Sequence, residues 1–331
     1  SMLAWPIKNT FELIDTSDQS AQDELNKGSG TEEAILAICG KVLGLNNVNP
    51  EQNFFDLGGD SLSGTRLIIA LEQALNIELP MHELYENPVM GDFVQYIENA
   101  RLAPEKNSNA KKSPLMLAED AQLDFDISLN GRRAHIPPNL NDSSGHVFLT
   151  GATGFFGSFL IKELLSTTKA TLHCLVRARD TAHAQERIYG TLKQYKISLT
   201  NAEKSRIIAI PGDLTKKFLG LDQNQFTTLA NTLDMIFHNG AVVNYVDSYS
   251  TLKKPNVFGS QEVIRLACQQ RIIPLQYISS ISVFETLGFF TGREMIYENE
   301  GVEESEHYVR LGYSQSKWVA EKMMENARDK G

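Results

Sequence analysis

Hydrophobic residues follow two different spacings along the chain. Between residues 31 and 100 they recur every three or four positions, as they do on one face of an amphipathic helix. From residue 145 onward, short apolar runs typical of buried strands alternate with longer helical stretches. The change of pattern predicts a small helical domain followed by an α/β domain, and 331 residues are enough for both.

The first domain is expected to contain four helices. Thr31 caps the first helix, and Ser61 opens the second, whose apolar positions extend over residues 62–75. A short turn of helix is expected around Leu84, and a last helix over residues 90–100. The loop between the first two helices is long, and it carries the most unusual sequence of this region.

That loop ends in Asn-Phe-Phe-Asp-Leu-Gly-Gly-Asp-Ser-Leu, residues 53–62. Gly58 and Gly59 permit a tight turn. Ser61 then lies at a helix start, where free backbone N–H groups and the helix dipole favour a phosphate. Serine is also a common helix cap, so a purely structural Ser61 is the alternative. A cap does not need the Phe-Phe-x-Leu-Gly-Gly run before it, which favours a phosphate-bearing serine.

The second domain is expected to contain five strands separated by helical sequence. The strands are expected at residues 146–150, 171–176, 206–210, 235–238 and 275–278. The helical stretches include residues 156–165, 181–196 and 256–268. Such alternation predicts a Rossmann-like, doubly wound parallel sheet.

A glycine-rich turn follows the first strand directly. Its sequence is Gly-Ala-Thr-Gly-Phe-Phe-Gly, with a G-x-x-G-x-x-G spacing instead of the more common G-x-G-x-x-G. Glycines there let the backbone approach a pyrophosphate, which rests on the helix N-terminus. We therefore expect dinucleotide contacts from Gly151, Thr153, Gly154, Phe155, Phe156 and Gly157.

The end of the second strand favours NADPH over NADH. An NAD-preferring site usually has Asp or Glu there, whereas this chain has Arg177-Ala178-Arg179. A cation at Arg177, with support from Arg187, suits a 2′-phosphate, although solvated arginines are the alternative. After the third strand, Asp213-Leu214 is expected near the adenine, with a plain turn aspartate as the other interpretation.

Two Tyr-x-x-x-Lys pairs occur, and only one has the right context. Tyr189 and Lys193 follow the second strand, whereas Tyr313 and Lys317 come about thirty residues after a strand that ends in Ser279-Ser280-Ile281-Ser282. A serine, a phenol and an ammonium can then converge on one carbonyl. Lys317 would hold the nicotinamide ribose and lower the pKa of the phenol. Tyr313 would donate the proton, and Ser280 would bind the developing oxyanion.

Charge is unevenly distributed. The chain carries a net charge of −10, and residues 31–100 alone hold eleven acidic and two basic residues. This acidic module argues against nucleic-acid binding and fits a domain that meets protein partners through complementary patches. The three cysteines are far apart and suggest buried hydrophobes rather than a disulfide framework or a metal site. No run is long enough to span a membrane, and no signal sequence is recognised, so we expect a cytoplasmic protein.

The Leu-Gly-Gly-Asp-Ser-Leu segment resembles the carrier domains of nonribosomal peptide and polyketide synthases. The resemblance implies that Ser61 carries 4′-phosphopantetheine, attached by a phosphopantetheinyl transferase. The expected organisation is a tail or linker at residues 1–30, a carrier domain at 31–100, a linker at 101–144 and a reductase domain at 145–331. Within the linker, residues 104–114 are polar, whereas 123–127 and 132–138 have enough apolar character to lie on the second domain.

The second domain resembles the extended short-chain dehydrogenase/reductase family, and within it the thioester reductase domains of nonribosomal peptide synthetases and carboxylic acid reductases. The supporting stretches begin at Leu149, Leu175, His238 and Gly312. The resemblance gives Ser280 the catalytic serine position, with Ser282 as a fallback. It also implies a cofactor groove lined by Asn239, Gly240 and Ala241, His238 as part of that backbone turn, and Asn256 as a structural polar group.

Together these resemblances imply a carrier–reductase didomain that acts after upstream adenylation or condensation modules. NADPH would reduce the tethered acyl or peptidyl thioester to an aldehyde, and a second reduction would give an alcohol. Redox-neutral release by cyclisation is one alternative, and a carrier and docking module without chemistry is another. In the resembling family a substrate-binding region follows the Tyr-Lys helix, so we expect that Gly331 ends a fragment.

Overall fold

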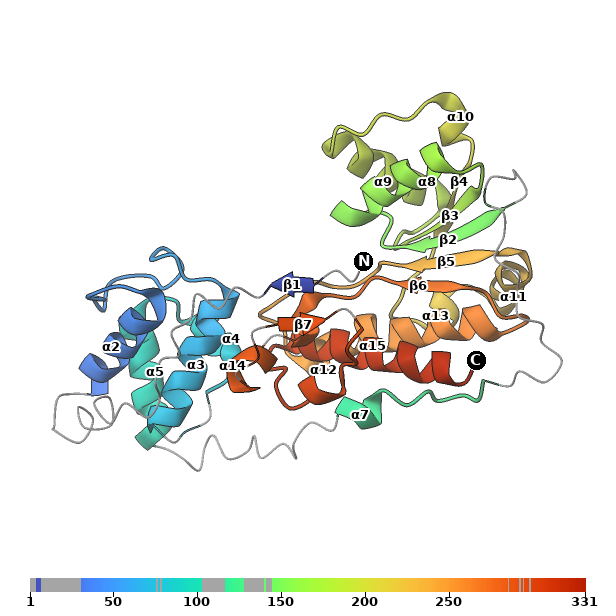
Figure 1. Ribbon diagram of the computed structural model, residues 1–331. Helices are drawn as coiled ribbons and strands as arrows, with labels where there is room; N and C mark the ends of the chain where they lie inside the picture. Colours follow the sequence, from blue (N-terminus) through green and yellow to red (C-terminus); the bar gives the residue numbers. More distant parts are fainter. Residues whose placement is uncertain are drawn as a thin grey trace. The chain divides into compact units, whose positions relative to one another are not determined.

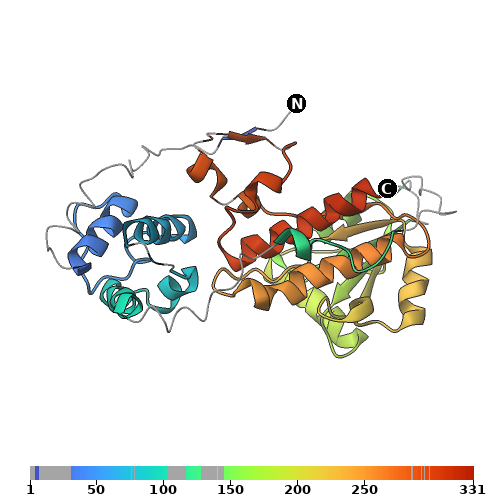
Figure 2. The same cartoon turned by 90° about the horizontal axis from the view of Figure 1, so that it is seen from below.

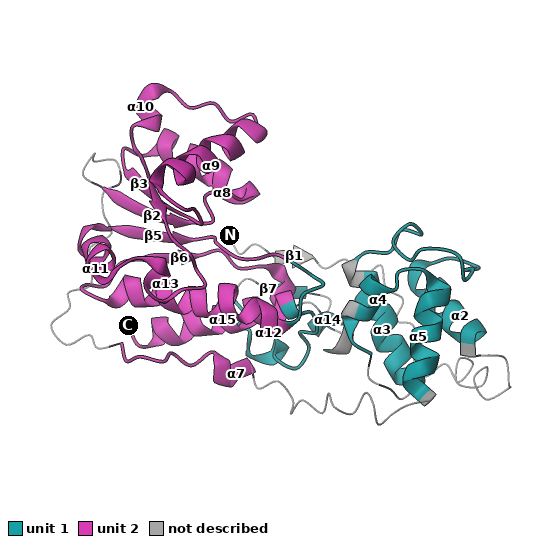
Figure 3. Ribbon diagram, turned by 180° about the vertical axis from the view of Figure 1, so that it is seen from behind, with its two compact units in different colours: residues 1–116, 244–248, 284–312 teal, residues 117–243, 249–283, 313–331 magenta. Residues whose placement is uncertain are grey.

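The computed structural model (Figure 1) comprises two compact units, shown in Figure 3. Unit 1 consists of Ser1–Met116, Asn244–Ser248 and Phe284–Gly312, and unit 2 of Leu117–Val243, Tyr249–Val283 and Tyr313–Gly331. The structure describes residues 4–6, 31–75, 77, 79–102, 117–127, 140, 145–284, 286–291, 293, 295–297 and 299–331.

Unit 1 contains the four expected helices, which are confirmed with small changes at their ends. They are α2 (Thr31–Leu43), α3 (Ser61–Leu75), α4 (Met81–Glu86) and α5 (Met90–Leu102). Their apolar faces pack around one core, in which Ile35, Phe54, Leu67, Leu84 and Phe93 have no exposed surface. The core explains why the spacing of apolar residues predicted these helices well.

The Gly-Gly turn before α3 needs both of its glycines. Gly58 has a φ of +94°, a left-handed conformation that other residues adopt with strain. A Cβ at Gly59 would lie 2.3 Å from a ring carbon of Phe54. The turn is therefore packed on the buried Phe54 ring, and it delivers the chain to the start of α3.

A second part of unit 1 was not predicted from sequence. Strand β1 (Ala4–Pro6) pairs antiparallel with β7 (Met295–Tyr297). Helix α14 (Leu287–Thr291) and the 3-10 turn η5 (Glu303–Ser305) lie on either side of β7 in sequence. Apart from β1, the expected tail at residues 1–30 lies outside the described residues.

Unit 2 is built on the expected parallel sheet, with strand order β4-β3-β2-β5-β6 (Figure 1). All four neighbouring pairs are parallel. The chain moves outward from β2 to β4 and then returns to place β5 on the other side of β2, which makes the sheet doubly wound. The strands are β2 (His146–Thr150), β3 (Thr171–Val176), β4 (Ile207–Pro211), β5 (Met235–His238) and β6 (Leu275–Tyr277).

Helices cover both faces of this sheet (Figures 1 and 2). One core packs α8 and α9 on β2, β3 and β4, and another packs α11 and α13 on the opposite face. The long α15 lies beside α13 in both views. The bounds are α8 (Phe155–Thr167), α9 (Thr181–Gln194), α10 (Asn201–Lys204), α11 (Gln223–Thr232), α12 (Tyr249–Leu252), α13 (Gly259–Cys268) and α15 (Gly312–Asp329), with 3-10 turns η2 (Lys217–Gly220) and η4 (Ile281–Phe284).

The helix expected over residues 256–268 has a different start. Lys253–Phe258 forms a π-helical turn, η3, and α13 begins only at Gly259. The predicted strand and helix ends elsewhere differ by one or two residues, as is common at frayed ends. Cys39, Cys174 and Cys268 are buried free thiols, as expected.

Part of the linker is bonded to unit 2. Helix α7 (Leu117–Asp120) places Asp120 2.6 Å from the Tyr249 hydroxyl, and Asp124 lies 2.6 Å from an Arg265 nitrogen. The ring of Phe125 stacks under the same guanidinium, 4.1 Å from its carbon. These contacts hold residues 117–127 on the unit, whereas the segments 104–114 and 132–138 lie outside the described residues.

Candidate active site

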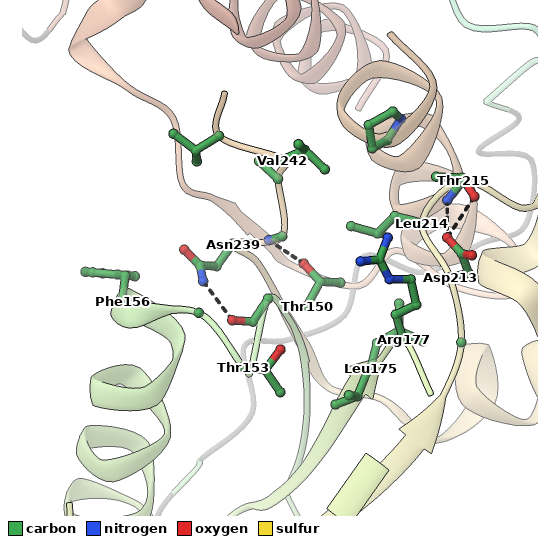
Figure 4. Close-up of a pocket in the computed structure, with 18 of the residues that line it drawn as sticks. Thr150, Thr153, Phe156, Leu175, Arg177, Asp213, Leu214, Thr215, Asn239 and Val242 are labelled. Carbon is green, nitrogen blue, oxygen red and sulfur yellow. Dashed lines mark hydrogen bonds between the residues drawn. The ribbon is translucent and has the colours of Figure 1, made fainter. Parts of the chain in front are cut away.

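A cavity of about 460 Å³ opens where the parallel strands end (Figure 4). In doubly wound sheets, ligands bind at this edge, next to the point where the strand order reverses. Most lining residues come from the ends of β2 and β3, the start of α8 and the loops after β4 and β5, and α9 and η3 contribute one each. They are Thr150, Gly151, Thr153, Gly154, Phe155, Phe156, Leu175, Val176, Arg177, Arg187, Gly212, Asp213, Leu214, Thr215, Asn239, Gly240, Ala241, Val242, Val243 and Pro255.

The glycine-rich turn forms one wall of this cavity. Gly151 has a φ of +72°, and a Cβ there would lie 2.8 Å from the Gly240 nitrogen. Gly157 does not line the cavity but packs against the turn, since a Cβ at this position would lie 2.1 Å from the Gly151 oxygen. The backbone can therefore come close to a pyrophosphate, whose charge suits the adjacent N-terminus of α8.

A buried hydrogen-bond network joins the turn to the loop after β5. Thr150 Oγ1 accepts from the Gly240 N–H at 2.8 Å, and Asn239 Nδ2 donates to the Gly151 oxygen at 3.3 Å (Figure 4). His238 lies behind them, with its ring nitrogens 2.7 Å from Thr150 Oγ1 and 2.9 Å from Ser260 Oγ. The loops that line the cavity are thus fixed to one another.

Burial keeps His238 neutral. Its exposed fraction is 1%, and burial followed by the charge of Lys317 lowers its pKa to about 3. Both of its ring nitrogens are engaged inside the protein. This environment agrees with the interpretation of His238 as part of the turn rather than as a base.

Two arginines line the far end of the cavity. The Arg187 guanidinium donates to the carbonyl oxygen of Arg177, and the Arg177 side chain extends toward Leu214 and Asp213 (Figure 4). Both residues line the cavity, whereas Arg179 lies outside its lining and pairs with Asp180. Two guanidinium groups beside a glycine cradle fit a dinucleotide that carries an additional phosphate.

Asp213 lies on the same side of the cavity. Its carboxylate accepts from the Thr215 N–H at 2.9 Å and from the Thr215 hydroxyl at 2.8 Å. Burial tends to raise the pKa of Asp213, but these bonds and nearby positive charges, Arg177 among them, hold it below its usual value. Asp213 is therefore a charged acceptor whose orientation is set by the turn that follows it.

Tyr313 and Lys317 lie one turn apart on α15, with exposed fractions of 7% and 3%. The Lys317 ammonium donates to the Ile278 oxygen at 2.7 Å and lies 4.2 Å from the centre of the Tyr277 ring. Burial lowers the pKa of Lys317 to about 8, against the opposing effect of Glu321. The structure thus brings Lys317 to the segment that follows β6. Its partner, Ile278, precedes Ser280 by two residues.

Ser280 begins a hydrogen-bonded turn after β6. Its hydroxyl accepts from the Ser282 N–H at 3.2 Å and from the Ser282 hydroxyl at 2.9 Å. Ser280, Tyr313 and Lys317 lie outside the set of residues that line the cavity. Asn256 connects the two groups, because it bonds the backbone of Val242 at the cavity and donates to Ser316 Oγ on α15 at 2.9 Å.

The rival Tyr-x-x-x-Lys pair has a different environment. Tyr189 is a residue of α9 that packs against the core of the sheet, and Lys193 is exposed. This difference supports the choice made from sequence context.

Some lining residues were missed by sequence reasoning. Val242, Val243 and Pro255 reach the cavity from the loop after β5 and from η3, where no motif marks them. Leu175, Val176 and Thr215 were also missed, although each lies at or just after a strand end. That position was the available signal, because ligands meet a parallel sheet at its carboxyl edge.

A family model for NAD-binding proteins, described as male sterility protein, matches residues 149–331, more than half of the chain. The chain belongs to this family. A second model, the phosphopantetheine attachment site, matches residues 33–97. The chain therefore joins a carrier domain to an NAD-binding domain of the male sterility family, which agrees with both resemblances.

Curated relatives of this chain are longer proteins. The chain is 36% identical over 293 residues to a linear gramicidin synthase of Brevibacillus parabrevis, covering 88% of this chain and 6% of that protein. It is 35% identical over 301 residues to nonribosomal peptide synthetase asaC from Aspergillus flavus, covering 90% and 29%. The chain thus spans less than a third of the length of either relative.

A solved structure agrees with this assignment. The terminal R domain of the myxalamid PKS-NRPS pathway is 36% identical, with a TM-score of 0.59, and the match covers 66% of this chain and 53% of that one. Within the described residues, no helix is long and apolar enough to cross a membrane.

In the carrier domain, Asp60 occupies the cap position that was considered for Ser61. Its carboxylate accepts from the Ser63 N–H at 2.8 Å, and its own N–H donates to the Ser63 hydroxyl at 2.7 Å. Ser61 is the first residue of α3, and its side chain lies outside what the structure describes. Asp60 therefore makes a cap at the start of α3, and the role of the Ser61 side chain, as a cap or as a phosphopantetheine attachment point, stays a prediction.

Proposed function

We propose that this chain is the carrier and reductase part of a nonribosomal peptide synthetase and releases its product by NADPH-dependent reduction. The acyl or peptidyl thioester tethered to Ser61 through 4′-phosphopantetheine is converted to an aldehyde. A second round of the same chemistry would give an alcohol.

The observation that carries this proposal is the environment of Lys317. Its buried ammonium is bonded to the Ile278 oxygen at 2.7 Å, and Tyr313 precedes it by one helical turn. A cation beside a phenol stabilises the phenolate and so favours proton donation by the phenol. Ser280 follows two residues after Ile278, which supports a hydroxyl donor near the same reacting oxygen.

The cavity supports NADPH as the reductant. The glycine cradle at Gly151 and Gly157 leaves room for a pyrophosphate, and Arg177 and Arg187 suit a 2′-phosphate. When bound, NADPH supplies a hydride to the carbonyl carbon of the thioester. Asn239, Gly240 and Ala241 border the cavity on the side of β5.

Residues of the protein would stabilise and protonate the oxygen of that carbonyl. Ser280 donates a hydrogen bond to the oxygen as negative charge develops on it, and Tyr313 transfers its phenolic proton to the same atom. Lys317 stabilises the phenolate that remains. The hydroxyl proton of the resulting hemithioacetal then passes to the sulfur as the carbon–sulfur bond breaks, which leaves an aldehyde and the free thiol of the arm.

The proposed partners follow from this chemistry. A phosphopantetheinyl transferase must load Ser61, and upstream adenylation or condensation modules must supply the acyl group. The acidic balance of residues 31–100 supports protein partners with basic docking surfaces. A cytoplasmic location is part of the proposal.

Replacing Tyr313 by Phe in the complete synthetase tests the assignment. Phenylalanine keeps the ring but removes the proton, so NADPH oxidation should fall by at least about 100-fold while NADPH still binds. Tyr189→Phe makes the same change in the rival pair and should leave turnover within about twofold of wild type. Unchanged turnover in Tyr313→Phe would refute the catalytic assignment.

A further inference from the structure

Helix α15 is attached to the end of β6 at two consecutive residues. Lys317 donates to the Ile278 oxygen, and the Ser279 hydroxyl donates to a carboxylate oxygen of Glu321. Residues four apart lie on the same face of a helix, so one face of α15 holds both contacts. The next residue of the strand segment is Ser280.

The Glu321 carboxylate lies in an unusual environment for a charged group. It is half-buried, and burial, together with the charge of Glu325, raises its pKa, while the bond from Ser279 and the charge of Lys317 oppose the rise. Burying a carboxylate costs free energy unless hydrogen bonds or a counter-charge compensate it. Glu321 has both kinds of compensation, and both involve the segment that carries the proposed catalytic groups.

Among the residues that the structure describes, Glu321 is the carboxylate that influences the ionisation of Lys317. From β6, Tyr277 presents its ring, and burial, followed by Glu321 and Tyr313, holds the pKa of Tyr277 well above its usual value. From β5, the buried His238 is neutral, because its pKa lies at about 3. On α15 itself, Glu321 favours the charged form of Lys317 against the effect of burial.

We infer that Glu321 is a positioning residue of the reductase site. Through Ser279 it fixes the backbone that carries Ser280, and as a counter-charge it keeps Lys317 protonated. The inference rests on the proposed function for its catalytic meaning, but the two physical effects of Glu321 can be measured without turnover.

Two variants separate these effects. Ser279→Ala removes the hydrogen bond and keeps the carboxylate charge. Glu321→Gln removes the charge and keeps an oxygen that can accept from Ser279. Glu325→Gln is the matched control, because it makes the same charge change one turn later on α15, where the carboxylate pairs with Lys322 at 3.2 Å.

The first readout is the titration of Lys317 in this chain, followed by ¹⁵N NMR of the lysine side chains, with the signal assigned by its loss in Lys317→Arg. Removing a nearby negative charge favours the neutral amine, so Glu321→Gln should move the Lys317 titration to lower pH by about one unit. Ser279→Ala and Glu325→Gln should leave it near the wild-type position. Equal behaviour of Glu321→Gln and Glu325→Gln would overturn the counter-charge role.

The second readout is the pH dependence of NADPH oxidation in the complete synthetase. Glu321→Gln should move the loss of kcat at alkaline pH to lower pH, because the charged Lys317 is the active form. Ser279→Ala should lower kcat by about 10- to 100-fold without moving that limb, since it displaces Ser280. Wild-type kcat in Ser279→Ala would overturn the positioning role.

NADPH affinity gives the fold control, and the titration separates the two proposals. All three variants should bind NADPH within about twofold of wild type, because Ser279, Glu321 and Glu325 lie outside the cavity lining. If wild type oxidises no NADPH, the proposed reductase function fails. The Lys317 titration still decides for or against Glu321 in that case, because it requires no turnover.

Discussion

At the scale of single residues, the two arginines at the cavity differ from their neighbour in what they can contact. Arg177 and Arg187 line the cavity and are linked to each other, whereas Arg179 lies outside the cavity lining and pairs with Asp180. A charged hydrogen bond to a phosphate is strong, but an exposed ion pair contributes little. The preference for NADPH should therefore depend on Arg177 and not on Arg179.

Arg177→Ala should weaken NADPH binding by about 10- to 100-fold and change NADH binding by less than about threefold. The reason is that only NADPH carries the 2′-phosphate. Titration of each coenzyme into the chain, followed by calorimetry, measures both affinities. Arg179→Ala is the matched control and should bind NADPH as wild type does. Equal losses for NADPH and NADH in Arg177→Ala would contradict the assignment.

Much of the cavity could be predicted at this scale, because its residues sit in motifs that constrain the backbone. Gly151 is required by its left-handed φ, and Gly157 by its close approach to the Gly151 oxygen. Such requirements appear in the sequence as glycines at fixed spacing. Val242 and Pro255 belong to no such motif. Only the tertiary fold brings them to the edge of the cavity, so the local sequence does not predict their place there. The contact of Lys317 with a nicotinamide ribose stays a prediction.

At the scale of elements, the start of α3 depends on a reciprocal pair of hydrogen bonds between Asp60 and Ser63. The pair satisfies backbone N–H groups that would otherwise lack a partner at the helix end. The stability of the carrier domain should therefore be sensitive to Asp60.

Asp60→Ala should destabilise the carrier domain by about 1 kcal/mol, the usual cost of losing such a cap. Hydrogen exchange of the α3 amides should become correspondingly faster at the first turn, and mass spectrometry of peptides from residues 61–75 measures it. Asp56→Ala removes the same charge from an exposed position in the preceding loop and serves as the control. Equal exchange in the two variants would show that charge, and not the cap, is responsible.

The N-terminal edge of the sheet carries a pair of histidines on neighbouring strands. His146 Nδ1 lies 2.9 Å from His173 Nε2, so one ring must donate and the other accept. His173 has an exposed fraction of 7%, and burial, followed by the charge of His146, lowers its pKa to about 4. The ordinary value is near 6.5, so the unfolded chain takes up this proton at higher pH than the folded chain does.

This difference predicts a loss of stability on the acid side. The contribution of His173 is fully present above pH 6.5 and is lost as pH falls from 6.5 toward 4, a change of about 3 kcal/mol. Urea unfolding of the sheet-containing unit at several pH values between 7 and 4 measures the slope. His173→Gln cannot titrate and should show a shallower slope. An equally steep slope in the variant would show that other groups cause the loss.

Elements with strong periodic patterns were predicted well, and those that depend on distant partners were not. The strand expected at 171–176 is β3 itself, because its buried apolar run leaves few alternatives. Strand β7 has only three residues, and its pairing with β1 joins segments almost 300 residues apart, which local sequence does not reveal. The π-helical turn η3 was not predicted, although Pro255 within Lys253–Phe258 cannot donate the backbone hydrogen bond of a regular helix.

At the scale of the whole molecule, the carrier helices and the sheet have separate cores. The carrier core contains residues between Ile35 and Ile97, whereas the two cores of the sheet begin at Val147 and Phe148. Each domain can therefore keep its structure without the other's packing. This organisation suits the proposed function, in which the carrier meets upstream modules before it meets the reductase.

The central claim is that cargo held on Ser61 leaves by reduction. The most direct measurement is a single turnover of the complete synthetase, loaded with an acyl-pantetheine arm on Ser61 and supplied with NADPH deuterated at the transferable position. The account predicts an aldehyde with one deuterium at its carbonyl carbon, one NADP⁺ formed per acyl group released, and no product from Ser61→Ala. Release of an unlabelled or cyclised product without NADPH consumption would contradict it.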